Sequence, residues 1–189
     1  MDLLNEILAH NARFVEEQAR TVTKSPEKKI ALFTCMDTRL VEFLEPAMGL
    51  RRGDAKVIKN AGNTIVDPFG AVMRSLVVAV YALGCEEIYV IGHLDCGMSQ
   101  IDGEELERRM LARGVDPQVI TNVHGSLTEW IGAFKDPCGN VHRVVEIIRS
   151  SPLIPVDVPV HGLMFDPAKG RLDLLVNGYG GAGAQEKTP

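Results

Sequence analysis

The sequence predicts an α/β fold in which a mostly parallel central β-sheet is flanked by helices. Short apolar runs suited to buried strands alternate with longer segments of helical periodicity. Such alternation favours parallel strands joined by right-handed crossovers, with helices on both faces of the sheet. An N-terminal helical arm and a C-terminal antiparallel edge strand complete the expected architecture.

The first third of the chain supplies the arm and two expected strands. Residues 2–20 carry apolar side chains at helical spacing, which predicts an amphipathic helix. After a polar linker, residues 30–33 form an apolar run that is short enough for a buried strand. Helical periodicity follows over residues 40–48, and residues 56–59 predict a second strand that ends in a loop at residues 60–63.

The remaining elements follow the same logic. Pro68 opens an apolar helix expected to reach residue 83, and residues 88–91 predict the third strand. Further helical patterns occupy residues 104–113, 118–134 and 141–149. Residues 163–166 and 172–176 flank a turn and predict a hairpin.

Length and composition indicate one globular domain with short extensions. The chain has 189 residues, of which 46% are hydrophobic and 24% are charged, and its mean hydropathy is +0.04. We expect an N-terminal helical arm and linker in residues 1–28, a metal-binding α/β catalytic domain in residues 29–178, and a flexible tail in residues 179–189.

Charge and hydropathy restrict the partners. A formal net charge of −5 and a pI near 5.5 provide no basic face for nucleic acid, so a small molecule is the expected partner. Charged residues interrupt the apolar stretches at residues 2–20 and 76–91, which argues against a signal peptide and a membrane span. The expected location is therefore cytoplasmic, where cysteines stay reduced and serve metals or catalysis more often than disulfides.

Three soft ligands follow predicted strands. Cys35 comes just after the first strand, and His93 and Cys96 come just after the third. Because the carboxyl ends of parallel strands share one edge of a sheet, these side chains are expected to meet there. Two thiolates and one imidazole suit zinc, and three protein ligands leave the fourth tetrahedral position for water, as in a catalytic site.

Asp37 and Arg39 are the candidate catalytic residues. Two thiolates cancel the charge of the zinc ion and weaken it as a Lewis acid, so bound water needs help to ionise. Asp37 lies two residues after Cys35 and is suited to accept a hydrogen bond from that water, while Arg39 holds the carboxylate ionised. The alternative is an ordinary ion pair at a strand end.

On these motifs the chain resembles the compact bacterial branch of the β-class carbonic anhydrases, whose signature is Cys-x-Asp-Ser-Arg followed by His-x-x-Cys-Gly. Here the two segments read CMDTR at residues 35–39 and HLDCG at residues 93–97. Further matches are NAGN at residues 60–63 and VHG at residues 160–162. The resemblance spans about residues 28 to 178.

The resemblance implies reversible hydration of carbon dioxide to bicarbonate and a proton by zinc-bound hydroxide. It makes Cys35, His93 and Cys96 the zinc ligands, and Asp37 with Arg39 the catalytic dyad. It also implies a homodimer or a multiple of dimers in which the N-terminal helix clasps the neighbouring subunit. In a second state known in the family, the aspartate moves onto zinc, which implies activity that rises steeply with pH.

Other functions and residues stay open at this stage. Carbonyl sulfide and carbon disulfide hydrolases share the scaffold and the ligands, and a non-catalytic zinc-thiolate redox sensor is a rival outside enzymes. Asp95 is either a partner of the site or a solvated loop carboxylate. The remaining cysteines and histidines have no assigned role; they are Cys85, Cys138, His10, His124, His142 and His161. Among them, Cys138 and His142 have the i, i+4 spacing of one helix face.

Overall fold

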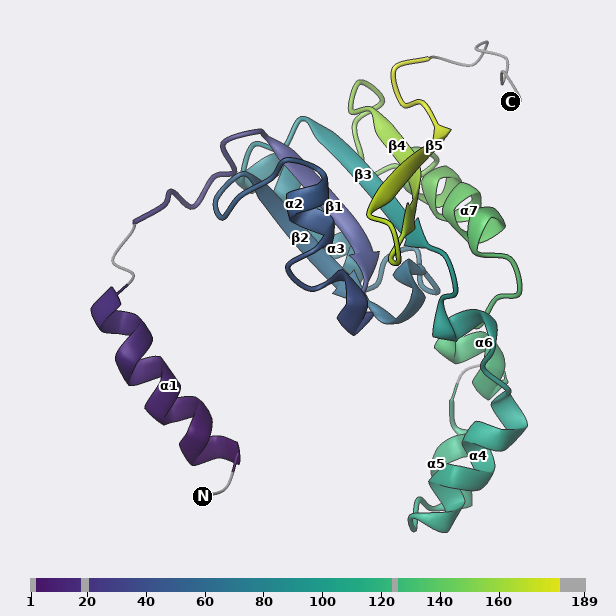
Figure 1. Ribbon diagram of the computed structural model, residues 1–189. Helices are drawn as coiled ribbons and strands as arrows, with labels where there is room; N and C mark the ends of the chain where they lie inside the picture. The colour runs from purple at the N-terminus through teal and green to yellow at the C-terminus, as the bar shows by residue number, and fades with distance from the viewer. Residues whose placement is uncertain (1–2, 18–20, 124–125, 181–189) are drawn as a thin grey trace.

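The structure is a computed structural model, and it describes residues 3–17, 21–123 and 126–180. A five-stranded sheet forms its centre, with the order β2-β1-β3-β4-β5 (Figure 1). The first four strands in this order pair in parallel and the last pair is antiparallel. The strands are β1 (Ile30–Cys35), β2 (Ala55–Asn60), β3 (Glu87–His93), β4 (Val160–Asp166) and β5 (Arg171–Val176). This sheet confirms the predicted fold class.

Seven α-helices accompany the sheet in the described part of the chain. They are α1 (Leu3–Glu17), α2 (Leu44–Ala47), α3 (Ala71–Val77), α4 (Gly103–Ala112), α5 (Pro117–Thr121), α6 (Leu127–Ile131) and α7 (Pro137–Arg149). Single helical turns add η1 (Thr38–Leu40), η2 (Ala61–Asn63), the π-helical η3 (Val78–Ala82) and η4 (Gly97–Ser99). No described helix combines the length and the apolar character that crossing a membrane requires.

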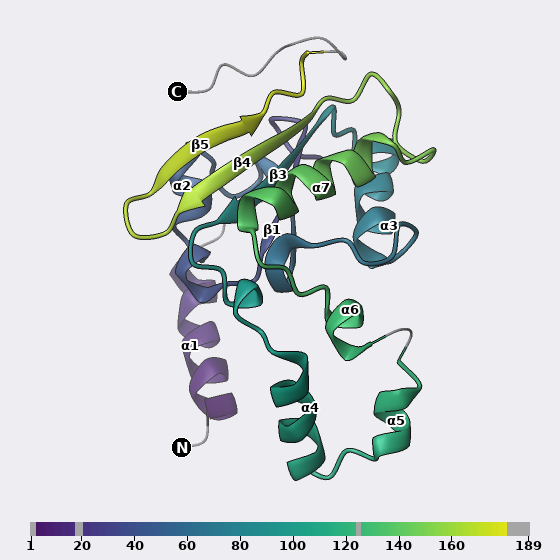
Figure 2. The same cartoon turned by 90° about the vertical axis from the view of Figure 1, so that its right-hand side faces the viewer.

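Each face of the sheet has its own apolar core because side chains alternate along the strands. Phe33 of β1 points toward α3 and α7, where it joins a cluster that includes Leu76 and Val144. Its neighbour Leu32 points to the opposite face and packs with Leu44 of α2. Figure 2 shows α3 and α7 beside the sheet, whereas α4, α5 and α6 extend away from it.

Two helix predictions were too long, for local reasons. The segment 40–48 is not one helix, because Glu42 adopts a left-handed conformation with φ 54° and separates η1 from the short α2. The segment 118–134 contains two short helices, since Ser126 forms a capping box that starts α6 and Gly132 ends it in the left-handed region.

Two other helices begin at different residues than expected. The helix expected from Pro68 begins at Ala71, because Gly70 donates its amide to the Asp67 carbonyl in a preceding turn. Helix α7 begins four residues before the expected start, where Asp136 caps the first turn and Pro137 occupies its first position.

Helix α1 lies within the predicted N-terminal arm and exposes its apolar residues. Leu3, Leu4, Ile7, Leu8, Phe14 and Val15 are each 51–70% exposed. Residues 1–2 and 18–20 of the arm lie outside the described residues, as does the predicted tail from residue 181 onward.

Candidate metal centre

Two neighbouring strands place the three predicted ligands at one edge of the sheet. Cys35 is the last residue of β1 and His93 is the last residue of β3, and these strands pair directly in parallel. Cys96 follows three residues later, after a sharp turn in which Asp95 takes a φ of 53°. Across this turn the Cys96 sulfur comes within 4.8 Å of the ligand nitrogen of His93.

The ligand atoms converge in a buried position. The sulfur, nitrogen and sulfur atoms of Cys35, His93 and Cys96 all lie within 4.8 Å of one another. The two Sγ atoms are 4.0 Å apart, and each of the three residues is at most 4% exposed. In the described residues this is the sole group of three or more Cys, His, Asp or Glu side chains arranged to hold a metal ion.

The imidazole of His93 is oriented by its own backbone neighbour. The Nδ1 atom lies 2.9 Å from the carbonyl oxygen of Leu94, an acceptor, so Nδ1 donates and the lone pair is on Nε2. Nε2 is buried and has no hydrogen-bond partner. Burial lowers the pKa of His93, but contacts with the Cys35 sulfur and the Leu94 carbonyl raise it more strongly.

The surroundings of the two sulfur atoms shift their pKa values in opposite directions. Hydrogen bonding from the Cys96 thiol lowers the pKa of Cys35 to about 4 despite burial, with further contributions from His93 and the Gly62 amide. The Gly62 N–H lies 3.3 Å from the Cys35 sulfur and donates to it. The contact with the Cys35 sulfur, together with burial, raises the pKa of the Cys96 thiol. These contacts therefore favour the thiolate form of Cys35.

These residues fit a zinc ion. Two sulfurs each about 2.3 Å from one zinc ion lie roughly 3.8 Å apart when the ligands are tetrahedral, close to the spacing found here. A buried imidazole nitrogen without a hydrogen-bond partner is costly unless it serves a ligand, and a metal ion would satisfy His93 Nε2. The donor set of two thiolates and one imidazole favours zinc over magnesium or calcium.

Asp37 and Arg39 form the predicted pair beside the ligands. The Arg39 amide and Nε donate to Asp37 Oδ1 over 2.8 and 3.0 Å, and Nη2 donates to Oδ2 over 2.9 Å. These hydrogen bonds lower the pKa of Asp37 to about 2. Asp37 Oδ2 also lies 3.8 Å from His93 Nε2, so the carboxylate faces the point on which the ligand atoms converge.

Asp95 belongs to the same charged group. Its Oδ2 lies 2.9 Å from Arg39 Nη1, and its backbone carbonyl accepts from Nη2 over 2.8 Å. The Gln100 side-chain amide donates to the other carboxylate oxygen. Arg39 therefore links Asp37 to Asp95, whose side chain is also 68% exposed. Asp95 is thus a solvated loop carboxylate that also contacts Arg39 of the site.

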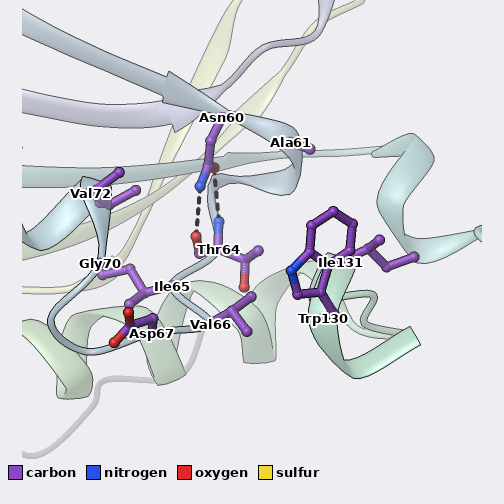
Figure 3. Close-up of a pocket in the computed structure, with 11 residues that line it drawn as sticks. Asn60, Ala61, Thr64, Ile65, Val66, Asp67, Gly70, Val72, Trp130 and Ile131 are labelled. Atoms are coloured by element: carbon purple, nitrogen blue, oxygen red, sulfur yellow. Dashed lines mark hydrogen bonds between the residues drawn. The ribbon is translucent and has the colours of Figure 1, made fainter. Parts of the chain in front are cut away.

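A cavity near the site lies beside the loop that follows β2, not over the ligands. This cavity of about 270 Å³ is lined by residues that include Ala61, Val66 and Trp130 (Figure 3). None of the three ligands, Asp37 or Arg39 lines it. The sequence predicted a loop at residues 60–63, but no pattern in it predicted that the Gly62 amide would contact the Cys35 sulfur.

The other cysteines, and the other histidines among the described residues, do not join this centre. Cys85 is buried in the core, and burial raises the pKa values of both Cys85 and Cys138. Cys138 and His142 have no third ligand among the described residues. His10 is on the exposed α1, and His161 is buried beside Glu87 at the opposite ends of the strands. His124 lies outside the described residues.

Comparisons with known proteins agree with the motifs. The carbonic anhydrase family profile matches residues 30–172. YtiB of Bacillus subtilis, a proposed carbonic anhydrase, is 46% identical over 185 residues, covering 95% of this chain and 99% of that protein. The crystal structure of β-carbonic anhydrase isoform I from Trichomonas vaginalis has a TM-score of 0.90 at 40% identity and covers 95% of this chain and 100% of that one. A carbon disulfide hydrolase of Acidithiobacillus thiooxidans is 31% identical over 77% of this chain and 76% of that protein.

Proposed function

This chain belongs to the β-carbonic anhydrase family of lyases, and from that premise we propose that it hydrates carbon dioxide reversibly with one zinc ion. Cys35, His93 and Cys96 hold the ion in this proposal. The single observation that carries it is the convergence of two buried sulfurs on an imidazole nitrogen that has no hydrogen-bond partner. When bound, zinc supplies the Lewis acidity that activates a water molecule for attack on carbon dioxide.

Asp37 orients the reacting water in this proposal. Its Oδ1 already accepts two hydrogen bonds from Arg39, whereas Oδ2 accepts one and faces the ligand atoms. Oδ2 therefore retains a lone pair with which to accept a hydrogen bond from an O–H of that water. Because Arg39 holds the pKa of Asp37 near 2, the carboxylate stays ionised at neutral pH and acts as an acceptor, not a donor.

The substitution Asp37→Asn tests this role in the zinc-loaded enzyme. Stopped-flow hydration of carbon dioxide should slow by about 10²-fold or more, the usual contribution of a positioned acid or base. Zinc content should stay at one ion per chain, because Asp37 is not one of the three ligands. Asp173→Asn provides a matched control, since Asp173 is 47% exposed on β5 and pairs with Arg171.

Two results would overturn the proposal. Full turnover in Asp37→Asn would remove Asp37 from the reaction, and full zinc occupancy in Cys96→Ser at limiting zinc would remove Cys96 from the ligands. Carbonyl sulfide and carbon disulfide should be run in the same assay, because a similar protein carries the name carbon disulfide hydrolase. Turnover of these molecules with no hydration of carbon dioxide would assign the sulfur substrates instead.

We also propose that the chain forms a homodimer or a multiple of dimers through its N-terminal arm, in a reducing, cytoplasmic compartment. The exposed apolar side chains of α1 support the first point. The need for two reduced thiols supports the second, and all four cysteines are free. Residues 29–178 form the catalytic domain in this proposal. A mass measured by light scattering that equals one chain would exclude the dimer.

A further inference from the structure

The loop between β2 and α3 is held in an uncommon backbone shape. Gly62 and Asn63 both lie in the left-handed region, with φ values of 72° and 43°. The side chain of Asn60 closes the loop, since its Oδ1 accepts from the Thr64 amide and its Nδ2 donates to the Thr64 carbonyl (Figure 3). All four residues from Gly62 to Ile65 are buried, so their polar groups need partners inside the protein.

Helix α7 supplies those partners from a distant part of the chain. Asn140 is 3% exposed and its Nδ2 donates to the carbonyl oxygens of Gly62 and Asn63 over 3.0 and 3.4 Å. Arg143, one turn further along α7, donates to the Ile65 carbonyl over 3.0 Å and to the Thr64 hydroxyl. The two side chains thus hold every residue of the loop from Gly62 to Ile65.

The two α7 side chains also fix each other. Arg143 Nη2 donates to Asn140 Oδ1 over 2.9 Å, which leaves the amide nitrogen of Asn140 directed at the loop. This hydrogen bond settles the orientation of the amide, because the reversed orientation would place its NH2 group against the guanidinium. Asn140 is therefore a directional donor, and Arg143 is its anchor.

Both backbone groups of Gly62 are consequently held in place by hydrogen bonds. Its carbonyl is bound by Asn140, and its N–H points at the Cys35 sulfur over 3.3 Å. With φ and ψ fixed, the position of the carbonyl determines the direction of the amide of the same residue. Loss of the Asn140 donor would leave two buried carbonyls unpaired, so the loop would have to move to satisfy them.

This contact has a chemical consequence for a thiolate-rich metal site. Two thiolates neutralise a divalent ion and reduce its power to polarise water. A hydrogen bond to a ligand sulfur withdraws part of that charge, as hydrogen bonds to sulfur do at other thiolate centres. Resting on the proposed zinc ligands, we propose that Asn140, anchored by Arg143, is a positioning residue that holds the Gly62 amide on the Cys35 sulfur and so tunes the metal centre.

Two readouts test the inference without measuring turnover. The first is the amide proton resonance of Gly62 in ¹⁵N-labelled, metal-free protein, which should shift upfield when the hydrogen bond to sulfur is lost. The second is the sulfur-to-metal charge-transfer band of the cobalt(II)-substituted protein, which should move to longer wavelength when the sulfur holds more charge.

Three variants separate positioning from general structural damage. Asn140→Asp keeps the shape of the side chain but replaces its donor with an acceptor, so both readouts should shift fully. Arg143→Gln removes the anchor only and should shift them in the same direction by less. Glu146→Gln changes an exposed side chain on the same helix and should leave both unchanged. Arg143→Gln carries the test if Asn140→Asp does not fold.

An Asn140→Asp protein that folds with an unmoved Gly62 resonance and an unmoved charge-transfer band would overturn the inference. Equal shifts in Glu146→Gln would overturn it too, because they would come from helix α7 as a whole. Failure of the proposed function looks different: the wild type itself would then show no sulfur-to-cobalt band. The Gly62 resonance of the metal-free protein would still decide whether Asn140 holds the amide on sulfur.

Discussion

Replacing Gly92 with alanine should separate α7 from the strand that ends in His93. Gly92 lies on β3 just before His93, and a Cβ added there would come within 2.6 Å of Val141 Cγ2. Gly162 on the neighbouring β4 makes a similar approach, because its added Cβ would lie 2.9 Å from Val141 Cγ1. The two glycines therefore let the Val141 side chain sit directly on the sheet, and Asn140 adjoins it on α7.

The cost of Gly92→Ala is steric. Gly92 does not have a positive φ, so alanine suffers no backbone strain there. Val141 is fully buried and stiff about χ1, and cannot yield as the far end of Met164 can at 3.2 Å. Overpacking of this kind costs about 1–3 kcal/mol. For a chain of this length the melting temperature falls by roughly 2–4 °C for each kcal/mol.

A double-mutant cycle measures this clash directly. Urea unfolding of the metal-free protein at one protein concentration should show that Gly92→Ala is destabilising alone but nearly neutral in the Val141→Ala background, a coupling of about 1–3 kcal/mol. Gly97→Ala is the control, since its added Cβ meets nothing within 4 Å. Additive losses in the double mutant, or no loss in Gly92→Ala, would refute the reasoning.

Two further predictions concern pH and metal. Burial lowers the pKa of His161 below its value in the unfolded chain, so the unfolded state binds more protons and stability falls as pH drops below about 6.5. The stability advantage of the wild type over His161→Asn, measured by urea unfolding, should therefore shrink between pH 7.5 and pH 5, and a constant difference would contradict the assignment. Removal of metal by a chelator should abolish hydration and lower the melting temperature, with recovery on adding zinc; at about 100 times the dissociation constant zinc stabilises by about 2.7 kcal/mol. A melting temperature unaffected by zinc would contradict binding to Cys35, His93 and Cys96.

The strands were the most predictable elements because their signal is local. Apolar runs of four residues located β1 and β3, and the shorter pair Val57 and Ile58 between two lysines located β2. The pairing of parallel strands followed from the helical segments between them. Helix limits were less predictable. Glu42 adopts a left-handed conformation and divides a segment of good helical periodicity. A glutamate does not predict that conformation, which glycine adopts far more often.

The candidate site likewise has parts that could be predicted from the sequence and parts that could not. Residues at strand ends could be placed together from the sequence, because parallel strands bring their carboxyl ends to one edge. The contacts of Asn140 and Arg143 could not, since they join residues 77 to 79 positions apart through side-chain directions that only packing determines. Such contacts leave no periodic trace in the chain.

Hydrogen bonds at the two kinds of ligand act in opposite directions. The Leu94 carbonyl accepts from His93 Nδ1 and so makes the imidazole a stronger electron donor toward a metal ion. The Gly62 amide donates to the Cys35 sulfur and makes that thiolate a weaker donor. A neutral imidazole donates electrons more strongly when a carbonyl accepts its N–H, whereas a pair of thiolates already supplies two negative charges. The fold therefore places its withdrawing contact on sulfur, where excess charge would most weaken the acidity of a bound ion, and a buried side chain of α7 keeps that contact in place.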